Sequence, residues 1–225
     1  MKETSKAMRR RAREVLVNDE GLRWSHIFKG HGIDVGSGGD PLTPVPGQKI
    51  WTRMLARAGI SWGRMQFTCQ HLDVPEGGGD DVTQFVGSNE QFDFVHGSQV
   101  LEHAIDPAVM LRSWLKVLRR GGYIVATVPD YELYEGCVWP SRWNGAHRST
   151  WSLRIEKTSA KIHCKLPEWL NREIGNPFGS EFDLKLCRLV DTNYDYRVGT
   201  TLDQTLDPDK GVEAFIEFIM KKAGN

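Results

Sequence analysis

A glutamate and a histidine stand side by side in the stretch FDFVHGSQVLEHAIDP, residues 92 to 107, directly after an apolar run. Glu102 and His103 could act as a catalytic pair, as metal ligands, or as hydrogen-bonded support for a loop. The zinc-type spacing H-E-x-x-H is absent, and no third metal ligand stands at a useful spacing along the chain. We therefore predict no metal here. We favour a pair that orients its own loop over one that contacts a substrate or cofactor.

A glycine turn in the stretch HGIDVGSGGDP, residues 31 to 41, is the second candidate for chemistry. A short apolar strand leads to Asp34, and Gly36 and Gly38 follow, where missing side chains let backbone amides approach a ligand. A dinucleotide fingerprint G-x-G-x-x-G would need glycine at position 41, where the chain has Pro41, and no Tyr-x-x-x-Lys pair occurs. The turn alone is a weak signal for a ligand, and a nicotinamide dehydrogenase is disfavoured.

These residues need a framework, and the apolar spacing predicts one of alternating strands and helices. Residues 92–98 are predicted as a buried strand, 106–122 as a helix and 123–129 as a further strand. A strand, a helix and a strand in this order form a crossover, which makes the two strands parallel. The other predicted elements are helices at 3–17 and 47–59, a strand leading into the turn at 31–41, and closing strands within 184–192 and 211–222.

The predicted helix at 106–122 carries signals at both ends. Asp106 can cap it, Pro107 suits its first turn, and Arg119 with Arg120 complement the helix dipole before a Gly-Gly stop. Its apolar stripe consists of Val109, Met110, Trp114, Leu115, Val117 and Leu118.

Length and composition fit a single domain over 1–225. The chain has 225 residues, enough for a sizeable core, and its 29 Lys plus Arg equal its 29 Asp plus Glu. This balance favours neither a nucleic-acid nor a membrane-surface protein, although basic residues crowd the N-terminal segment 1–30, which we predict as partly helical. From 131 to 185 the pattern weakens into aromatic, polar and proline-containing segments, which is typical of an insertion or lid on the substrate side.

The cellular location follows from cysteine usage and hydropathy. The four cysteines are scattered without a C-x-x-C pair, which indicates reduced thiols. No stretch approaches the roughly 20 apolar residues of a membrane span, and none has the apolar core of a signal peptide. We expect a cytoplasmic protein.

Together, the glycine turn and the stretch FDFVHGSQVLEHAIDPAVMLRSWLKVLRRGGYIVATVPD, residues 92 to 130, resemble the class I, Rossmann-like S-adenosylmethionine-dependent methyltransferases, especially the small-molecule branch. In that family a strand ends in Phe-Asp-x-Val, a loop has Ser-x-x-Leu-Glu-His, and a helix precedes Pro-Gly-Gly, whose proline is Arg120 here. Residues 131–152 resemble a subgroup often found among surface-polysaccharide genes. The resemblance covers most of 31–221. It implies a three-layer αβα fold with a mostly parallel sheet and an antiparallel C-terminal strand.

The resemblance also implies a site for S-adenosylmethionine, which leaves as S-adenosylhomocysteine. Asp34 and the glycine turn would line its methionine and ribose end, and Asp73 in HLDVPEGGGDDV aligns with the acid that accepts from both ribose hydroxyls. Asp80 or Asp81 would accept from the adenine amino group; an exposed acidic turn is the alternative explanation. The implied cofactor residues are Asp34, Gly36, Ser37, Gly38, Asp73, Asp80, Asp81, Val82, Gly97 and Ser98.

A histidine is the residue we expect to handle the acceptor. Methyl transfer is an in-line displacement, so the protein mainly supplies alignment, and a base is needed only for poorly acidic acceptors. For a hydroxyl acceptor, His147 in SRWNGAHRSTW is the first candidate base, where the resemblance puts the substrate wall, and His103 is the second. A hydrogen-bonded structural imidazole is the alternative for His147, and the nearby tryptophans favour lid packing.

We therefore expect a methyltransferase acting on a small molecule, with O-methylation of a sugar or sugar-linked metabolite as the leading hypothesis. A catalytically inactive cofactor-binding protein is the second, because no acid occurs between Asp40 and Asp73. Nucleic-acid methylation is the third, motivated by the basic N-terminal segment. It is disfavoured because no Asn/Asp-Pro-Pro-Tyr/Phe motif follows a strand.

Overall fold

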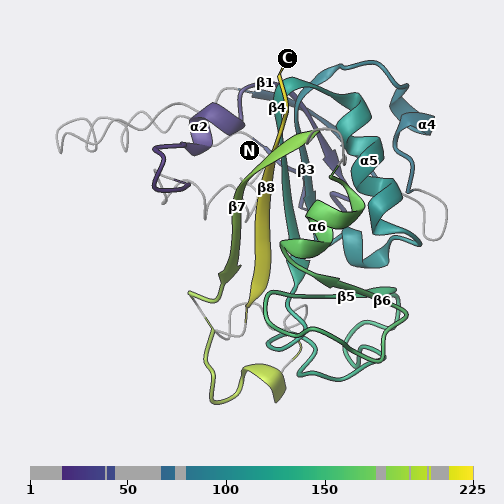
Figure 1. The fold of residues 1–225 in the computed structure, drawn as a ribbon, viewed down its shortest axis with the longest axis vertical. Helices are drawn as coiled ribbons and strands as arrows, with labels where there is room; N and C mark the ends of the chain where they lie inside the picture. Colours follow the sequence, from purple (N-terminus) through teal and green to yellow (C-terminus); the bar gives the residue numbers. More distant parts are fainter. Residues whose placement is uncertain are drawn as a thin grey trace.

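The computed structural model describes residues 17–38, 40–43, 67–73, 80–175, 181–192, 194–201, 203 and 213–224. The predicted helices at 3–17 and 47–59 lie outside these ranges, apart from Val17. The described residues form a six-stranded sheet with helices packed against it, and a small two-stranded sheet beyond one end of it (Figure 1). Within this part of the chain, each helix is too short or too polar to cross a membrane.

The main sheet has the strand order β2-β1-β3-β4-β8-β7. Its first four strands run parallel and are β2 (Phe67–Leu72), β1 (Gly30–Val35), β3 (Phe92–Ser98) and β4 (Leu118–Pro129). β8 (Phe215–Lys222) is antiparallel to β4 on one side and to β7 (Phe182–Val190) on the other. This confirms the predicted mixed sheet. The strand order reverses between β1 and β3, which is where open parallel sheets bind ligands.

Side chains of the central strands alternate between two apolar clusters, one on each face of the sheet. Val95 belongs to the same cluster as the buried residues of α5 (Pro107–Val117), the longest described helix. Its neighbour Phe94 belongs to the other cluster, with α2 (Trp24–Ile27), and packs edge-on against Phe28 with ring centroids 5.1 Å apart. Both faces are therefore covered, in agreement with the predicted αβα layers. The remaining short helices are α4 (Thr83–Val86), α6 (Glu168–Glu173), η1 (Leu101–His103) and η2 (Gly199–Thr201).

The N-terminus of α5 is built as the sequence predicts. The carboxylate of Asp106 accepts hydrogen bonds from the backbone N–H groups of Ala108 (2.8 Å) and Val109 (3.3 Å), and Pro107 occupies the first helical position. Most of the predicted stripe is buried, but Val109 is 40% exposed and does not belong to it.

The predicted helix end at residue 122 is wrong, because α5 ends at Val117 and β4 begins at Leu118. Leu118 pairs with Phe92 of β3 ahead of a register shift. Arg119 donates to the carboxylate of Asp93 at 3.0 Å. Arg119 therefore stabilises a strand pair rather than a helix end.

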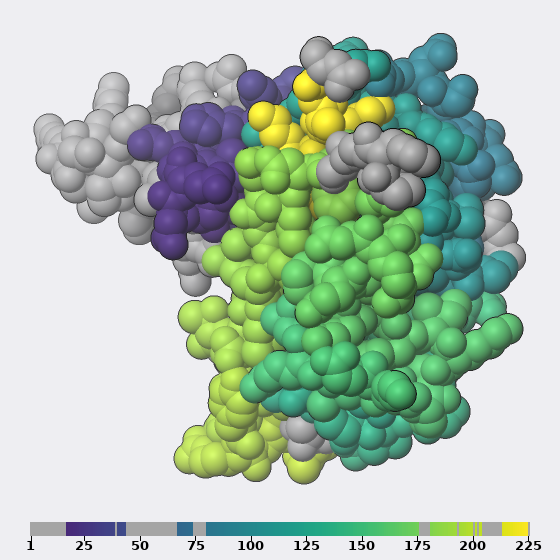
Figure 2. Space-filling model, in the orientation of Figure 1, coloured from purple at the N-terminus to yellow at the C-terminus, as the bar shows by residue number. Residues whose placement is uncertain are grey.

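Residues 131–175, predicted as part of an insertion, contribute to the main core. β5 (Ser149–Ser152) and β6 (Ile162–Lys165) form the small parallel sheet, which lies at the lower end of Figure 1 beside the end of β4. The ring of Trp151 is fully buried, 5.2 Å from Trp169 and 6.3 Å from Phe218 of β8. Lid packing is the expectation for the tryptophans near His147, whereas Trp151 packs into the main core. In Figure 2 the green residues of this segment cover the lower part of the visible face.

Gly97 of β3 faces Trp114 of α5, and this contact predicts a large effect on stability. A Cβ at position 97 would overlap Cη2 of Trp114 and lie 3.0 Å from its Cζ2, while Trp114 is fully buried. Gly97→Ala should therefore lower the free energy of unfolding by about 1–3 kcal/mol, measured by urea denaturation. Gly145→Ala is the matched control, because a Cβ there would lie more than 4 Å from every atom of the described ranges that could hinder it. Equal stability of the two variants would contradict this packing.

Candidate functional site

The predicted site residues gather at one edge of the sheet, where the parallel strands end. Asp73 follows β2, the glycine turn follows β1, Gln99 follows β3 and Asp130 follows β4. Residues 131–165 lie beyond this edge, at the lower end of Figure 1. The loops after parallel strands are the usual place for a ligand site in such a sheet.

The glycine turn and Asp73 meet at this edge. Oδ1 of Asp73 accepts from the backbone N–H of Gly38 at 3.0 Å and lies 3.2 Å from the hydroxyl of Ser37. Gly36 and Gly38 have φ of +68° and +49°, in the region that favours glycine. Among the residues that the structure describes, a Cβ on Gly38 would meet no atom within 4 Å, and Asp73 is exposed. The turn is therefore open to a ligand beside a carboxylate.

The carboxylate of Asp34 is buried and held by protein groups. Oδ1 lies 2.6 Å from Nδ1 of His96, and Oδ2 accepts from the backbone N–H of Leu42 at 2.7 Å. Burial alone would raise the pKa of Asp34, but His96 and the hydrogen bond from Leu42 hold it below its ordinary value. Asp34 thus ties β1 to β3 and to residues 40–43. A contact between its side chain and the cofactor stays a prediction.

The acids predicted for adenine also have protein partners. The two oxygens of Asp80 accept from the backbone N–H groups of 105–106, at 3.2 and 2.7 Å. Oδ1 of Asp81 accepts from the backbone N–H of Thr83 (3.0 Å) and from its hydroxyl (2.6 Å), at the start of α4. The side chain of Val82 is buried in the core. These three residues therefore shape the loop before α4, and their cofactor contacts remain predictions.

The end of β3 carries a strained residue, Gln99, which the resemblance places beside the methionine portion of the cofactor. Gln99 has φ of +55°, a conformation that non-glycine residues rarely adopt and that clusters at functional sites. Its backbone N–H donates to the carbonyl of Thr127 in β4 at 2.9 Å, and the hydroxyls of Ser98 and Thr127 are 2.9 Å apart. The place of Thr127 beside Ser98 and Gln99 follows from the pairing of β3 with β4, and no local motif indicates it.

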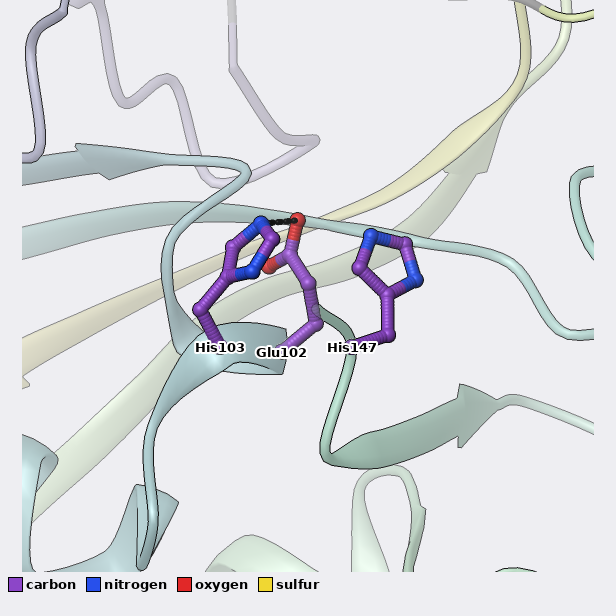
Figure 3. A group of neighbouring side chains, drawn as sticks. All are labelled: Glu102, His103 and His147. Atoms are coloured by element: carbon purple, nitrogen blue, oxygen red, sulfur yellow. Dashed lines mark ion pairs between the residues drawn. The ribbon is translucent and has the colours of Figure 1, made fainter. Parts of the chain in front are cut away.

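Glu102, His103 and His147 come together in what we call the EHH cluster. One atom suited to ligation on each residue lies within 4.8 Å of those on the other two. Glu102 and His103 belong to η1, and His147 lies in the loop before β5; the three side chains converge in Figure 3, and the two imidazoles meet edge to face. The backbone N–H of Arg148 donates to the carbonyl of Glu102 at 2.7 Å, which joins the two segments.

Each imidazole of the EHH cluster has its Nδ1 beside an oxygen acceptor. Nδ1 of His147 lies 2.7 Å from Oε1 of Glu135, and Nδ1 of His103 lies 3.3 Å from the carbonyl oxygen of Ala146. These contacts place the proton on Nδ1, so Nε2 is the nitrogen that carries a lone pair. Nε2 of His103 lies 3.9 Å from Oε1 of Glu102.

The carboxylates of this region are deeply buried. The side chain of Glu102 is 1% exposed, and its Oε2 has no hydrogen-bond partner among the described residues. Burial raises the pKa of Glu102 to about 8, and the nearby carboxylate of Glu135 adds to the rise. Oε2 of Glu135 is also buried without a partner in the described part of the chain. The site therefore holds several groups that can take up a proton or a cation.

Each member of the EHH cluster is a candidate from the sequence, but the sequence does not predict that the three lie together. Glu135 is not among the predicted residues. Spacing along the chain offers no third ligand, whereas the fold brings His147 to Glu102 from a distant loop. Glu135 lies in YELYEG, part of the stretch that resembles a family subgroup, but that resemblance assigns no role to Glu135.

The chain is similar in sequence to a known family and in structure to several solved proteins. The sequence profile of a family described as a methyltransferase domain matches residues 9–171, more than half of the chain. A search of curated proteins found no match. Among solved structures, an S-adenosylmethionine-dependent methyltransferase from Mesorhizobium loti is similar, with 16% identity over 87% of this chain and 92% of that chain, at a TM-score of 0.39. An arsenic(III) S-adenosylmethionine methyltransferase from Chlamydomonas reinhardtii has 12% identity over 99% and 75%, at 0.42. TM-scores this low carry no conclusion by themselves.

Proposed function

Because the chain belongs to the methyltransferase-domain family, whose cofactor is S-adenosylmethionine, we propose that it methylates a hydroxyl of a small molecule, specifically a sugar or a sugar-linked metabolite. One observation carries this proposal: the EHH cluster gathers proton-binding side chains at the sheet edge that also holds the glycine turn and Asp73. A hydroxyl is the acceptor that needs such groups, because it must lose its proton during transfer.

The residues at this edge fit the cofactor. The exposed carboxylate of Asp73 already accepts from the turn through Oδ1, and a carboxylate has further acceptor capacity for the two hydroxyls of a ribose. No described residue would contact a Cβ on Gly38, so the described part of the chain lets a ligand approach this backbone closely. When bound, S-adenosylmethionine supplies a methyl group that its sulfonium has already activated for displacement.

Within this proposal His147 is the residue that receives the proton of the acceptor. The carboxylate of Glu135 holds Nδ1 of His147 at 2.7 Å, so the ring is fixed and Nε2 is the basic nitrogen. The proton of the acceptor hydroxyl passes to Nε2 of His147. The acceptor oxygen forms a bond to the methyl carbon, while the carbon–sulfur bond breaks and leaves its electron pair on sulfur. His103 is the second candidate, since its ring lies 5.0 Å from that of His147.

Aromatic and basic groups around His147 support a sugar acceptor. The ring of Tyr134 lies 5.7 Å from the imidazole of His147, and the guanidinium of Arg142 lies 5.1 Å from the ring of Trp143. Aromatic rings suit the apolar face of a sugar, and guanidinium groups suit a phosphate or carboxylate carried by it. The resemblance of 131–152 to a subgroup found among surface-polysaccharide genes supports the same acceptor class.

The remaining parts of the proposal concern organisation and setting. Residues 131–185 serve as the acceptor-side part of a single domain over 1–225, and 1–30 as its N-terminal segment. The acceptor is a small molecule rather than a nucleic acid, which is supported by the formal net charge of zero. A cytoplasmic location is supported by cysteines that are all free thiols, Cys69, Cys137, Cys164 and Cys187.

An acceptor screen tests the proposed function. The full chain is incubated with S-adenosylmethionine and free sugars, sugar phosphates or nucleotide sugars, while phenols, amines and carboxylic acids serve as non-sugar acceptors. We expect S-adenosylhomocysteine to form with acceptors of the sugar class. Mass spectrometry detects this product. Transfer to the non-sugar acceptors alone would contradict the sugar assignment. Cofactor binding without transfer to any acceptor would favour the inactive alternative.

A further inference from the structure

We propose that the EHH cluster is a binding site for one divalent metal ion of the transition series, with Glu102, His103 and His147 as its protein ligands. Two imidazoles and one carboxylate are a donor set that ions such as Zn²⁺ and Mn²⁺ accept. Three protein ligands leave further positions open, which is the arrangement of catalytic rather than structural metal sites.

The distances allow this assignment with small side-chain movements. The ligating atoms lie within 4.8 Å of one another, and Nε2 of His103 is 3.9 Å from Oε1 of Glu102. Atoms bound to one ion at about 2.0–2.2 Å lie roughly 3–4 Å from each other. The three side chains thus need to move inward by less than about 1 Å each, which rotation about their side-chain bonds can supply.

The hydrogen bonds around the two histidines are an independent indication of a metal site. Nδ1 of His147 faces the carboxylate of Glu135, and Nδ1 of His103 faces the carbonyl of Ala146. Metal-binding histidines almost always donate their second ring N–H to a carboxylate or a backbone carbonyl, which fixes the ring and raises the basicity of the coordinating nitrogen. Both rings of the EHH cluster show this pattern.

Two buried carboxyl oxygens without hydrogen-bond partners are the third observation. Oε2 of Glu102 and Oε2 of Glu135 are buried and lack a hydrogen-bond partner among the described residues. Both side chains are nearly inaccessible to water, with exposed fractions of 1% and 2%. A buried carboxyl oxygen without a hydrogen-bond partner lowers the stability of the folded protein. A bound cation offsets this loss directly at Glu102, which is a ligand, and indirectly at Glu135, which holds the ligand His147.

A metal ion at this position would change how the acceptor is activated, a role that rests on the proposed function. The acceptor oxygen occupies an open position on the ion, its hydroxyl becomes more acidic, and its proton passes to water. The oxygen then forms its bond to the methyl carbon as the carbon–sulfur bond breaks. Nε2 of His147 is a ligand in this form of the site, so acidification by the ion replaces proton removal by the imidazole.

Metal binding is measured first, without cofactor or acceptor. The full chain is treated with a chelator, freed of it, and dialysed against Mn²⁺ or Zn²⁺. We expect one ion per chain, with affinity reduced at least 100-fold in Glu102→Gln and His147→Gln. His26→Gln, which changes an exposed histidine on α2, should bind as the unchanged chain does. No binding, or equal binding by all variants, would overturn the site.

A variant of Glu135 and an activity assay after chelation test the metal site and its catalytic role separately. Glu135→Gln retains all three ligands and should weaken metal binding about 10–100-fold, with the circular dichroism spectrum unchanged. Full turnover by chelated protein would overturn the catalytic role of the ion while leaving the proposed methylation, with His147 as base, intact. Turnover that is lost on chelation and restored by the ion supports that role. Absence of methyl transfer under all conditions would refute the proposed function without touching the binding result.

Discussion

Asp73→Ala should weaken binding of S-adenosylhomocysteine by about 10–100-fold, because the proposed site uses this carboxylate for the ribose. Hydrogen bonds to a charged acceptor contribute about 1.5–3 kcal/mol each, and 1.4 kcal/mol corresponds to a factor of ten. Oδ1 of Asp73 also ties down Gly38 and Ser37, so the variant loses order in the turn as well as a ligand contact. Isothermal titration calorimetry measures the change directly.

Two control variants separate these contributions. Asp73→Asn keeps an oxygen for the turn but loses the charge, so its affinity should fall between those of the unchanged chain and Asp73→Ala. Asp19→Ala removes an exposed carboxylate before α2 and should leave the affinity unchanged. Undiminished binding by Asp73→Ala would show that the ribose-binding acid lies elsewhere.

His147→Ala is expected to lower the turnover number by about 100–10,000-fold, the usual range for removal of a group that handles the proton of an acceptor. The affinity for S-adenosylhomocysteine should change less than about threefold, because His147 lies in the loop before β5 and belongs to neither the glycine turn nor the hydrogen bonds of Asp73. The effect is expected whether His147 acts as a base or as a metal ligand, since both roles act on the acceptor hydroxyl.

The control for this prediction is a histidine outside the EHH cluster. His163 lies on β6 and bonds through its ring to Thr150 and Ile155, so His163→Ala disturbs the same segment without touching the cluster. Its turnover should stay well above that of His147→Ala. Equal rates for the unchanged chain and His147→Ala would remove His147 from the mechanism and leave it as structural support for Glu135.

The parts of the fold that are predicted correctly have local signals. The crossover from β3 through α5 to β4 follows from two apolar runs and from Asp106 with Pro107, all within neighbouring residues. The end of α5 could not be found in this way. Residues 118–122 have a composition that also suits a helix terminus, and the pairing of Leu118 with Phe92 decides in favour of a strand.

The site also contains both kinds of residue, those that a local motif indicates and those that only the fold brings together. The glycine turn is visible as a motif, and the family pattern leads from it to Asp73. The EHH cluster has no such pattern, because Glu102 and His103 come from η1 and His147 from a loop after β4. Rules for metal-ligand spacing apply to ligands on one element, so they could not relate these residues. Their meeting depends on how residues 131–165 fold back over the sheet edge, which no short stretch of sequence specifies.

A crystal structure of the chain with S-adenosylhomocysteine would test most directly where methyl transfer takes place. We expect the ribose hydroxyls on the carboxylate of Asp73, the ligand backbone along the turn at 36–38, and the sulfur atom facing the EHH cluster across a space that an acceptor hydroxyl can fill. A ligand whose sulfur points away from Glu102, His103 and His147, or one bound away from the carboxyl edge of the sheet, would contradict this arrangement.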